Sequence, residues 1–382
     1  MKVLRVIRSL HPATGGPAVG ISSFARALDR LGCTTTVVTL DSPESPWLSS
    51  LDYDFIACGP VFGSFGYKPR LVTFLRELCS EYDAVIIDGI WQYHSYATYL
   101  ALRSSTIPYY VYTHGMLDPW FKRKYPLKHL KKLLYWNLFE YYVLKSATRV
   151  LFTAQSEMNL AAQSFHRYST FPQVVGFGVE PPPQVSQSDV DAFLTCHPHL
   201  SCKRIFLFLG RLHPKKGLEL LIQGFCESVS VDPTAHLLIG GTGASSYVQT
   251  LKGLVNQLGM SSHITFVGHL DGVQKWAAFS IAELFCLSSY QENFGVAVVE
   301  ALACGLPVLL SSSINIAQEV SSGSAGFVIN PCVSDVAAAL TYWMQSPDSL
   351  KLNMSAQASQ LYFNSFTIDS AAERLFRVIT SA

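Results

Sequence analysis

Apolar and polar residues follow two different patterns along this chain. Short apolar runs indicate buried β-strands, and the stretches between them carry apolar residues at helical spacing. The predicted strands span residues 4–7, 35–40, 84–87, 109–112 and 149–152 in the first half, and 205–210, 236–239, 264–267, 284–287, 308–310 and 326–329 in the second. Predicted helices span residues 20–31, 72–79, 218–228, 246–258 and 296–304. Strands that alternate with helices predict α/β domains with parallel sheets.

The alternation is interrupted once, by the sequence Glu180-Pro-Pro-Pro-Gln-Val-Ser-Gln-Ser188, which is typical of a linker. We therefore predict a Rossmann-like domain at residues 1–178, a linker at 179–202 and a second Rossmann-like domain at 203–365. The amphipathic segment from about 366 to 382 either packs on the second domain or crosses back to the first, and we assign it to the first. Ligands of such domains bind at the carboxyl ends of the strands, so we expect the site in a cleft between the two.

Composition narrows the class of protein. The chain has 382 residues, of which 49% are hydrophobic and 14% charged, and its net charge of +1 gives no general attraction to nucleic acid. No apolar run reaches the roughly 18 residues of a membrane span. The first eight residues carry charges inside an apolar run, which predicts a strand and not a signal peptide. The nine cysteines include no Cys-x-x-Cys pair, and we interpret them as reduced thiols of a cytoplasmic protein.

One loop raises the question of a metal site. Cys196-His-Pro-His-Leu-Ser-Cys202 supplies two thiols and two imidazoles, but their spacing matches no common zinc site. We interpret this segment as an ordinary loop and predict no metal ligands.

Glycine-rich turns follow three of the predicted strands. Gly210-Arg-Leu-His-Pro-Lys-Lys-Gly217 combines glycines with basic side chains that suit a phosphate-bearing ligand, although a solvated basic loop has the same composition. Gly240-Gly-Thr-Gly243 lacks the Gly-x-Gly-x-x-Gly spacing, and so does the loop with Gly15 and Gly16. These departures disfavour a nicotinamide- or flavin-binding protein, while both loops still let backbone amides approach an anion.

Two carboxylates flank the start of a predicted helix in Gln291-Glu-Asn-Phe-Gly-Val-Ala-Val-Val-Glu-Ala-Leu-Ala-Cys-Gly305. Glu292 lies before Gly295, and Glu300 lies about one turn inside the helix. An uncapped helix start attracts a diphosphate, whereas carboxylates beside it bind hydroxyls. Compensation of the helix dipole also explains Glu292, but a carboxylate at 300 in an apolar helix is costly unless something pairs with it or uses it.

In this order, the segments resemble the retaining glycosyltransferases of family 4, which have the GT-B fold of two Rossmann-like domains facing across a cleft. The similarity is carried by residues 210–217, 240–243, Phe266-Val-Gly-His-Leu270 and the run 292–308, so it covers about residues 203–335. The first half is similar through Gly15-Gly16 and Thr113-His-Gly-Met116. Each segment alone is weak evidence for the family, whereas the set of segments in this order is specific for it.

The resemblance implies transfer of a sugar from a nucleotide sugar to an acceptor hydroxyl, with retention of the anomeric configuration. Arg211 and Lys216 would grip the donor diphosphate and stabilise the charge that develops on the leaving nucleotide. Glu292 would hold donor-sugar hydroxyls, Glu300 would bind the ribose, and His114 resembles the family's histidine beside the donor sugar. The other implied donor-binding residues are Gly15, Gly16, Gly210, Gly241, His269, Leu270, Asn293, Phe294, Gly295 and Val296.

The charge of a diphosphate leaving group can be spread by Arg211, Lys216 and a helix start without a metal ion, so we predict no metal and no other cofactor. No residue is an evident covalent nucleophile. Glu292 is the candidate to test, and we favour sugar positioning as its role. Family frequency makes UDP-glucose the first donor to expect, ahead of UDP-N-acetylglucosamine and GDP-sugars.

The acceptor is expected on the first domain, where two segments that follow predicted strands are rich in aromatic and polar groups. The candidate acceptor-binding residues are Trp91, Tyr93, His94, Asp118 and Trp120. Their rings suit stacking on sugar faces, and they suit packing in a core or an interface equally well.

Basic residues concentrate in one segment, 121–136, where they interleave with leucines. Such a pattern suits an anionic membrane surface or a lipid-linked acceptor, and a solvated helix packed on its own domain explains it too. We predict a nucleotide-sugar donor, a glycan or lipid-linked acceptor, peripheral membrane contact through 121–136 at the inner face of the plasma membrane, and no nucleic-acid partner.

Other functions fit the same fold. A sugar-nucleotide epimerase would not use a separate acceptor, and a phosphorylase would need a lysine that binds pyridoxal phosphate. A non-catalytic protein that binds carbohydrate or nucleotide is the third alternative. The joint presence of Arg211, Lys216, Glu292 and Glu300 favours a hexosyltransferase of polysaccharide or glycolipid biosynthesis.

Overall fold

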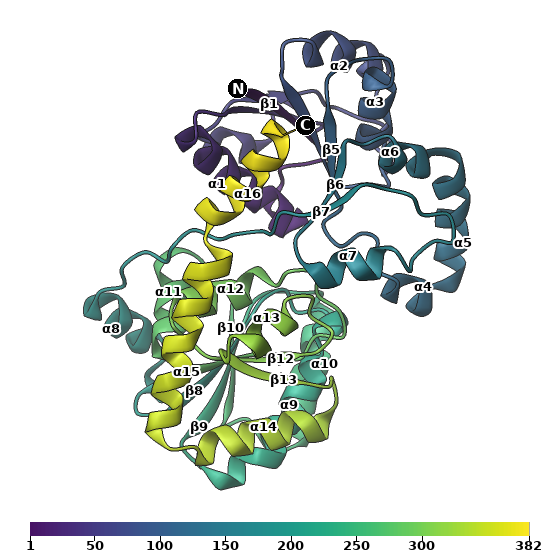
Figure 1. Ribbon diagram of the computed structural model, residues 1–382. Helices are drawn as coiled ribbons and strands as arrows, with labels where there is room; N and C mark the ends of the chain where they lie inside the picture. The colour runs from purple at the N-terminus through teal and green to yellow at the C-terminus, as the bar shows by residue number, and fades with distance from the viewer. Residues whose placement is uncertain (382) are drawn as a thin grey trace. The chain divides into compact units, whose positions relative to one another are not determined.

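A computed structural model describes residues 1–381, which form two compact units. Unit 1 comprises Met1–Glu180 and the chain from Thr367 onward, and unit 2 comprises Pro181–Phe366. The chain therefore leaves unit 1, builds unit 2 and returns to unit 1 with its last helix, α16 (Ile368–Thr380) (Figure 1).

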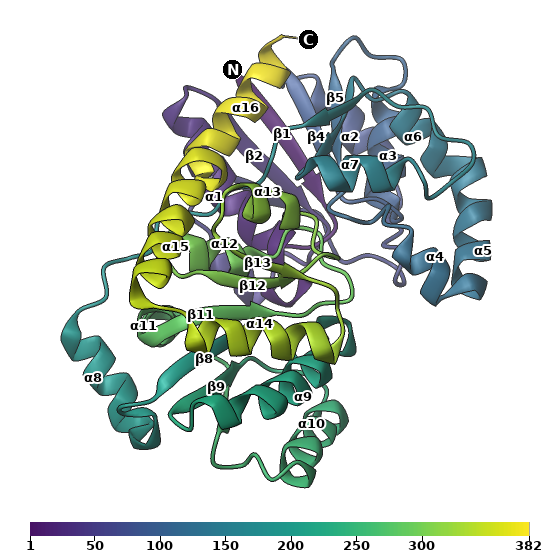
Figure 2. The same ribbon diagram turned by 60° about the horizontal axis from the view of Figure 1, so that its bottom comes forward.

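Unit 1 is built on a seven-stranded parallel sheet with the order β3-β2-β1-β4-β5-β6-β7. Its strands are β1 (Lys2–Ile7), β2 (Thr34–Thr39), β3 (Phe55–Ala57), β4 (Ala84–Asp88), β5 (Tyr109–Tyr112), β6 (Arg149–Phe152) and β7 (Pro172–Val174). Its other helices are α1 (Gly16–Arg30), α2 (Leu71–Cys79), α3 (Tyr93–Leu102), α4 (Trp120–Lys124), α5 (Pro126–Tyr135), α6 (Tyr141–Lys145) and α7 (Gln155–Ala161), with a π-helical turn, η3 (Trp136–Glu140), between α5 and α6. Helix α16 packs along α1 (Figures 1 and 2). Strands β4 and β5 are buried throughout, as expected for a parallel sheet covered on both faces.

Unit 2 repeats this architecture with a six-stranded parallel sheet in the order β10-β9-β8-β11-β12-β13. Its strands are β8 (Arg204–Leu209), β9 (Ala235–Gly240), β10 (Ile264–Gly268), β11 (Ala282–Leu287), β12 (Val308–Ser311) and β13 (Gly326–Ile329). Its helices are α8 (Gln187–Cys196), α9 (Leu218–Ser228), α10 (Ser245–Gln257), α11 (Gly272–Ile281), α12 (Val296–Ala303), α13 (Ala317–Ser322), α14 (Val333–Gln345) and α15 (Asp348–Leu361). Helix α14 packs on α9, whereas α15 packs on α12 and α13 (Figure 2).

The predicted class, two Rossmann-like α/β domains, is confirmed, and every predicted strand is present within one or two residues of its expected bounds. Strands β3 and β7 were not predicted. Each has only three residues and lies at an edge of the sheet, and β7 begins with Pro172. A run this short shows no periodicity, and proline disfavours the assignment of a strand except at such an edge.

The segment at 179–202 differs from the expected linker. The proline run joins unit 2, and α8 follows it and packs on α11. Ser186 and Asp189 form a capping box in which the serine side chain accepts from the Asp189 amide. The signal for this helix start was present in the sequence, directly after the prolines that suggested a loop.

The cysteines of the loop after α8 are not joined to each other. All nine cysteines are free thiols, and Cys196 and Cys202 are exposed. Among the residues that the structure describes, no three His, Cys, Asp or Glu side chains converge where they could hold a metal ion. No helix in the described part of the chain is long and apolar enough to cross a membrane.

In each sheet the strand order reverses beside the first strand, between β1 and β4 in unit 1 and between β8 and β11 in unit 2. Ligands of doubly wound folds bind outside the carboxyl ends of the strands at such a switch point. The loops that follow these four strands are therefore where binding residues are expected.

Candidate active site

The loop after β8 lies against the end of β11 at the switch point of unit 2. Gly217 closes this basic loop with φ +64°, and a Cβ there would lie 2.3 Å from the Ser288 carbonyl oxygen. Ser288 Oγ donates to the Gly217 carbonyl over 2.8 Å, and the Tyr290 amide donates to the Lys215 carbonyl over 2.8 Å. Glycine at position 217 is therefore what allows the two loops to meet.

The contact between the two loops places Lys216 next to Glu292. Lys216 Nζ donates to Glu292 Oε2 in an ion pair whose side chains are 15% and 17% exposed, and beside it Lys215 Nζ donates to Gln291 Oε1 over 2.9 Å. Burial would raise the pKa of Glu292, but the charges of Lys216, Lys215 and Arg211 outweigh burial and hold the pKa below its ordinary value. The carboxylate is therefore ionised and only accepts hydrogen bonds, which suits hydroxyl donors.

The rest of this loop is supported from inside unit 2. Asn315 Nδ2 donates to Asn293 Oδ1 over 3.1 Å, and the Phe294 ring packs edge-on against Phe366 at 5.7 Å between centroids. The Glu292 amide donates to the Ser313 carbonyl over 3.3 Å. The side chains of Asn293 and Phe294 thus shape the loop.

Helix α12 begins directly after this loop. Gly295 precedes it with φ +74°, and as the N-cap residue it has no side chain with which to cap the first amides of the helix. An uncapped start presents backbone donors and the positive end of the helix dipole. In the second turn, Glu300 Oε1 accepts from Lys275 Nζ over 2.9 Å. Glu300 is thus ion-paired, and this pairing offsets the free-energy cost of a carboxylate in an apolar helix.

The glycine turns after β8 and β9 touch. A Cβ at Gly241 would lie 1.8 Å from the Gly210 carbonyl oxygen, so close approach of the two backbones requires glycine there. After the next strand in the sheet, β10, Leu270 is buried and His269 is exposed. The structure therefore brings Gly210 and Gly241 into contact and places residues 269–270 at the same edge of the sheet.

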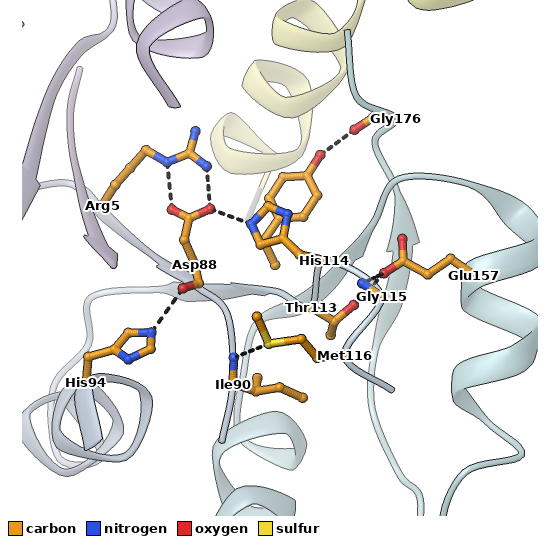
Figure 3. A network of polar contacts seen from close by, with 11 residues as sticks. Arg5, Asp88, Ile90, His94, Thr113, His114, Gly115, Met116, Glu157 and Gly176 are labelled. Carbon is orange, nitrogen blue, oxygen red and sulfur yellow. Dashed lines mark hydrogen bonds and ion pairs between the residues drawn. The ribbon is translucent and has the colours of Figure 1, made fainter. Parts of the chain in front are cut away.

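In unit 1, His114 is held at the end of β5 by a buried network (Figure 3). Its Nε2 lies 3.0 Å from Asp88 Oδ1, and its ring stacks on Tyr112 with 4.8 Å between centroids. Arg5 in turn donates to both carboxylate oxygens of Asp88, over 2.8 and 2.6 Å. Burial would raise the pKa of Asp88, but the charges and hydrogen bonds of Arg5 and His114 outweigh burial and hold the pKa at about 2.

An ionised Asp88 fixes the tautomer of His114. A charged carboxylate can only accept, so Nε2 of the imidazole carries the proton that it donates to Asp88. His114 has φ +48°, a left-handed conformation that is uncommon for residues other than glycine. Nδ1 is then the ring nitrogen that lies outside the bond to Asp88.

The backbone around His114 is fixed by a second buried carboxylate, Glu157 (Figure 3). Its Oε1 accepts from Thr113 Oγ1 over 2.8 Å and from the Gly115 amide over 2.6 Å, so the residues on both sides of the histidine bind one oxygen. Its Oε2 accepts from the amide and the hydroxyl of Thr153, each over 2.7 Å. Glu157 is a positioning residue for the β5 loop.

The glycines after β1 also lie at the switch point of unit 1. Gly15 has φ +91°, and α1 begins at Gly16 without a side-chain cap. A Cβ at Gly15 would meet no atom within 4 Å, so close packing does not explain this glycine and the backbone conformation does. The contact of Gly15 and Gly16 with a diphosphate stays a prediction, and this helix start is compatible with it.

The five predicted acceptor residues have different surroundings in the structure. His94 is only 1% exposed, and its Nε2 bonds to the Asp88 carbonyl oxygen at 3.0 Å. Its prediction as an acceptor contact is therefore wrong. Burial is the main cause that lowers the pKa of His94, to about 4. Trp91 donates its indole N–H to the Met116 carbonyl over 3.1 Å and packs on the unit 1 core. Asp118 accepts from the Trp120 amide over 2.7 Å at the start of α4. The half-buried Tyr93 and Trp120 stay predictions for sugar stacking.

Four positions of the site were not singled out from the sequence. Arg5 stood out as a charge inside an apolar strand, which calls for a buried partner, and Asp88 ends a buried strand. Lys275 and Glu157 carried no signal, because each lies in an amphipathic helix as an ordinary charged residue would.

The sequence contains two Asp-x-Asp triplets, a carboxylate spacing that can hold a divalent ion. Asp52 of the first pairs with Arg26 over 2.8 Å, and Asp189 of the second caps α8. Neither triplet contributes to a site at a switch point, so both serve local structure.

Both halves of the chain match family models. Residues 15–170 match the family described as Glycosyl transferase 4-like domain, and residues 197–361 match the family described as Glycosyl transferases group 1. The two matches contain every donor- and acceptor-binding residue predicted from the sequence.

Individual relatives are more distant. Mannosylfructose-phosphate synthase of Agrobacterium fabrum is 25% identical over 346 residues, which cover 83% of this chain and 76% of that protein. Phosphatidyl-myo-inositol mannosyltransferase of Mycolicibacterium smegmatis is 29% identical over 41% of this chain and 40% of its own length. The chain thus spans less than half of this relative, and the same holds for several D-inositol 3-phosphate glycosyltransferases.

The fold is shared with a solved structure over its full length. Anabaena HepE in complex with UDP and glucose superposes with a TM-score of 0.79 and 19% identity, covering 100% of both chains. The paired family matches and the paired Rossmann-like units agree with the resemblance seen in the sequence. The chain is a glycosyltransferase of the family 4 type with the GT-B fold.

Proposed function

We propose that this enzyme transfers a hexose from a nucleotide sugar to a hydroxyl of a glycan or lipid-linked acceptor, with retention of the anomeric configuration. The observation that carries the proposal is the arrangement at the β8/β11 switch point, where the Lys216–Glu292 ion pair lies beside the uncapped start of α12. Within one pair of loops, a cation and backbone N–H donors suit the diphosphate, and an ionised carboxylate suits the sugar hydroxyls.

In the proposed step, the bond from C1 of the sugar to the diphosphate oxygen breaks, and the acceptor oxygen bonds to C1 on the same face. The acceptor proton passes to the departing phosphate oxygen. Arg211, Lys216 and the amides at the start of α12 stabilise the charge that grows on the diphosphate, and Glu292 holds the sugar hydroxyls. These cations replace a divalent ion, so the transfer needs no metal.

For unit 1 we propose the roles that the resemblance implies for His114, Gly15 and Gly16. With Nε2 donating to Asp88, His114 presents Nδ1 to the donor sugar. Gly15 and Gly16 bring backbone amides to the diphosphate. The enzyme works on a cytoplasmic nucleotide sugar at the inner face of the plasma membrane, in the synthesis of a polysaccharide or glycolipid.

The donor we propose is UDP-glucose. The HepE structure that shares this fold was solved with UDP and glucose, although the relatives include mannosyltransferases. Titration calorimetry of the protein with UDP, GDP and ADP is expected to show the tightest binding for UDP. Tightest binding of GDP would overturn the choice of base.

Replacement of Glu300 by alanine is expected to raise the Kd for the nucleotide about 10- to 100-fold, because charge-assisted hydrogen bonds to the ribose hydroxyls would be lost. The same calorimetry measures the change, with Glu300→Gln as a second variant that keeps the shape of the side chain. Glu227→Ala, at an exposed position of α9, is the matched control. Nucleotide affinity in Glu300→Ala equal to that of the control would contradict the assigned role.

A further inference from the structure

The continuous helical segment α5–η3–α6 exposes a row of leucines. Leu127, Leu130, Leu134 and Leu138 are 85, 65, 64 and 54% exposed, and Tyr142 follows at 39%. Steps of three and four residues place these five side chains, called here the leucine face, on one side of the segment. A single exposed leucine needs no explanation, but a contiguous apolar row marks a contact surface.

Basic residues border the leucine face. Lys122, Arg123, Lys124, Lys128 and Lys131 are all exposed, and the chain from Pro119 to Phe139 contains no aspartate or glutamate. The next acidic residue, Glu140, is fully buried. This stretch therefore offers aliphatic side chains and positive charge together, and it contains no exposed acidic side chain.

We propose that the leucine face docks this enzyme onto an anionic phospholipid surface. An interfacial helix combines apolar residues that enter the acyl region with basic residues that reach the phosphate groups, and it needs no groove on its partner. This charge complementarity favours a lipid surface over a second copy of the chain, which would bring five further cations to the same contact. The docking segment extends beyond the predicted 121–136, to Tyr142.

The opposite side of the same segment holds the loop that follows β4. Lys132 Nζ lies 4.7 Å from the centroid of the Trp91 ring, and the Trp91 amide donates to Glu140 Oε2 over 3.1 Å. The Trp91 indole in turn donates to the Met116 carbonyl, in the loop that carries His114. Given the proposed function, a lipid-linked acceptor held at this surface would lie next to the loops that present Asp88 and His114.

Co-sedimentation of the full chain with phospholipid vesicles tests the proposal. The wild-type protein is expected to bind vesicles of phosphatidylcholine mixed with phosphatidylglycerol, to bind pure phosphatidylcholine vesicles far less, and to lose binding at high salt. The triple variant Leu127→Ser/Leu130→Ser/Leu134→Ser is expected to bind at least about tenfold more weakly. Leu352→Ser, at a position 71% exposed on α15 of unit 2, is the matched control.

Nucleotide affinity, measured by calorimetry without vesicles, shows whether the triple variant is folded and tests the proposed function independently. Equal binding of wild type and triple variant to the anionic vesicles would overturn the proposal, and so would wild-type protein that stays in the supernatant. Leucine-dependent dimerisation without vesicle binding would also overturn it, because the occupant would then be a second copy.

Discussion

Replacement of Lys216 by alanine is expected to lower turnover of the donor by about 10²- to 10³-fold, the usual loss when one preorganised donor to a developing charge is removed. Lys216 is held by Glu292 beside the start of α12, so under the proposed function its ammonium is already fixed before the donor binds. Release of nucleotide from the sugar nucleotide measures the loss. Nucleotide affinity should fall much less, because Arg211 and the helix start remain.

The neighbouring lysine supplies the control. Lys215 Nζ donates to Gln291 Oε1, so Lys215→Ala leaves the Lys216–Glu292 pair in place and should retain most of the activity. Lys216→Arg keeps a cation on a longer side chain and should recover part of the loss. An unchanged turnover in Lys216→Ala, or a larger loss in Lys215→Ala, would contradict the assigned role.

Replacement of Asp88 by alanine is expected to destabilise unit 1 by about 3–5 kcal/mol, because it leaves the Arg5 guanidinium buried without its counter-ion. Arg5 is 1% exposed, and both of its bonds to Asp88 would be lost. Denaturant unfolding measures the change, with Glu77→Ala on the exposed side of α2 as the control. In Arg5→Leu/Asp88→Leu no charge is stranded, so that variant should be more stable than Asp88→Ala.

The pH dependence of unfolding is a second test of the Arg5–Asp88 ion pair. The pKa of Asp88 is lower in the folded chain, at about 2, than its ordinary 3.8, so the pair adds stability above the ordinary value and loses it as the pH falls toward 2. Asp88→Ala should therefore show a weaker decline of stability over this acidic range. Wild-type and variant curves of the same slope would contradict the buried charge.

Alternation of short apolar runs with helical stretches was enough to predict both sheets, since the central strands of parallel sheets are apolar along their whole length. Edge strands such as β3 lack that signal. Within the site, glycine and charged residues next to strand ends predicted the loops of unit 2. Gly217 illustrates why, because its steric contact with Ser288 and its positive φ leave no alternative residue.

What the sequence did not indicate depends on residues distant along the chain. The partner of Glu300 is 25 residues away, and the partner of Arg5 is 83 residues away. For His94 the sequence predicted a ligand contact where there is none. This polar residue follows an apolar strand, but its side chain is buried inside unit 1. No local pattern distinguishes a histidine that faces the core from one that faces the site.

We propose that the switch-point residues of unit 2 catalyse the breakdown of a nucleotide sugar. Release of nucleotide by the wild-type protein from a panel of UDP- and GDP-sugars, in parallel with Lys216→Ala, tests it most directly. We expect slow hydrolysis of at least one donor, UDP-glucose first, and loss of this hydrolysis in the variant. Tight binding of a nucleotide without turnover of any sugar nucleotide, with or without added glycan or lipid-linked acceptors, would contradict it and identify a binding protein instead.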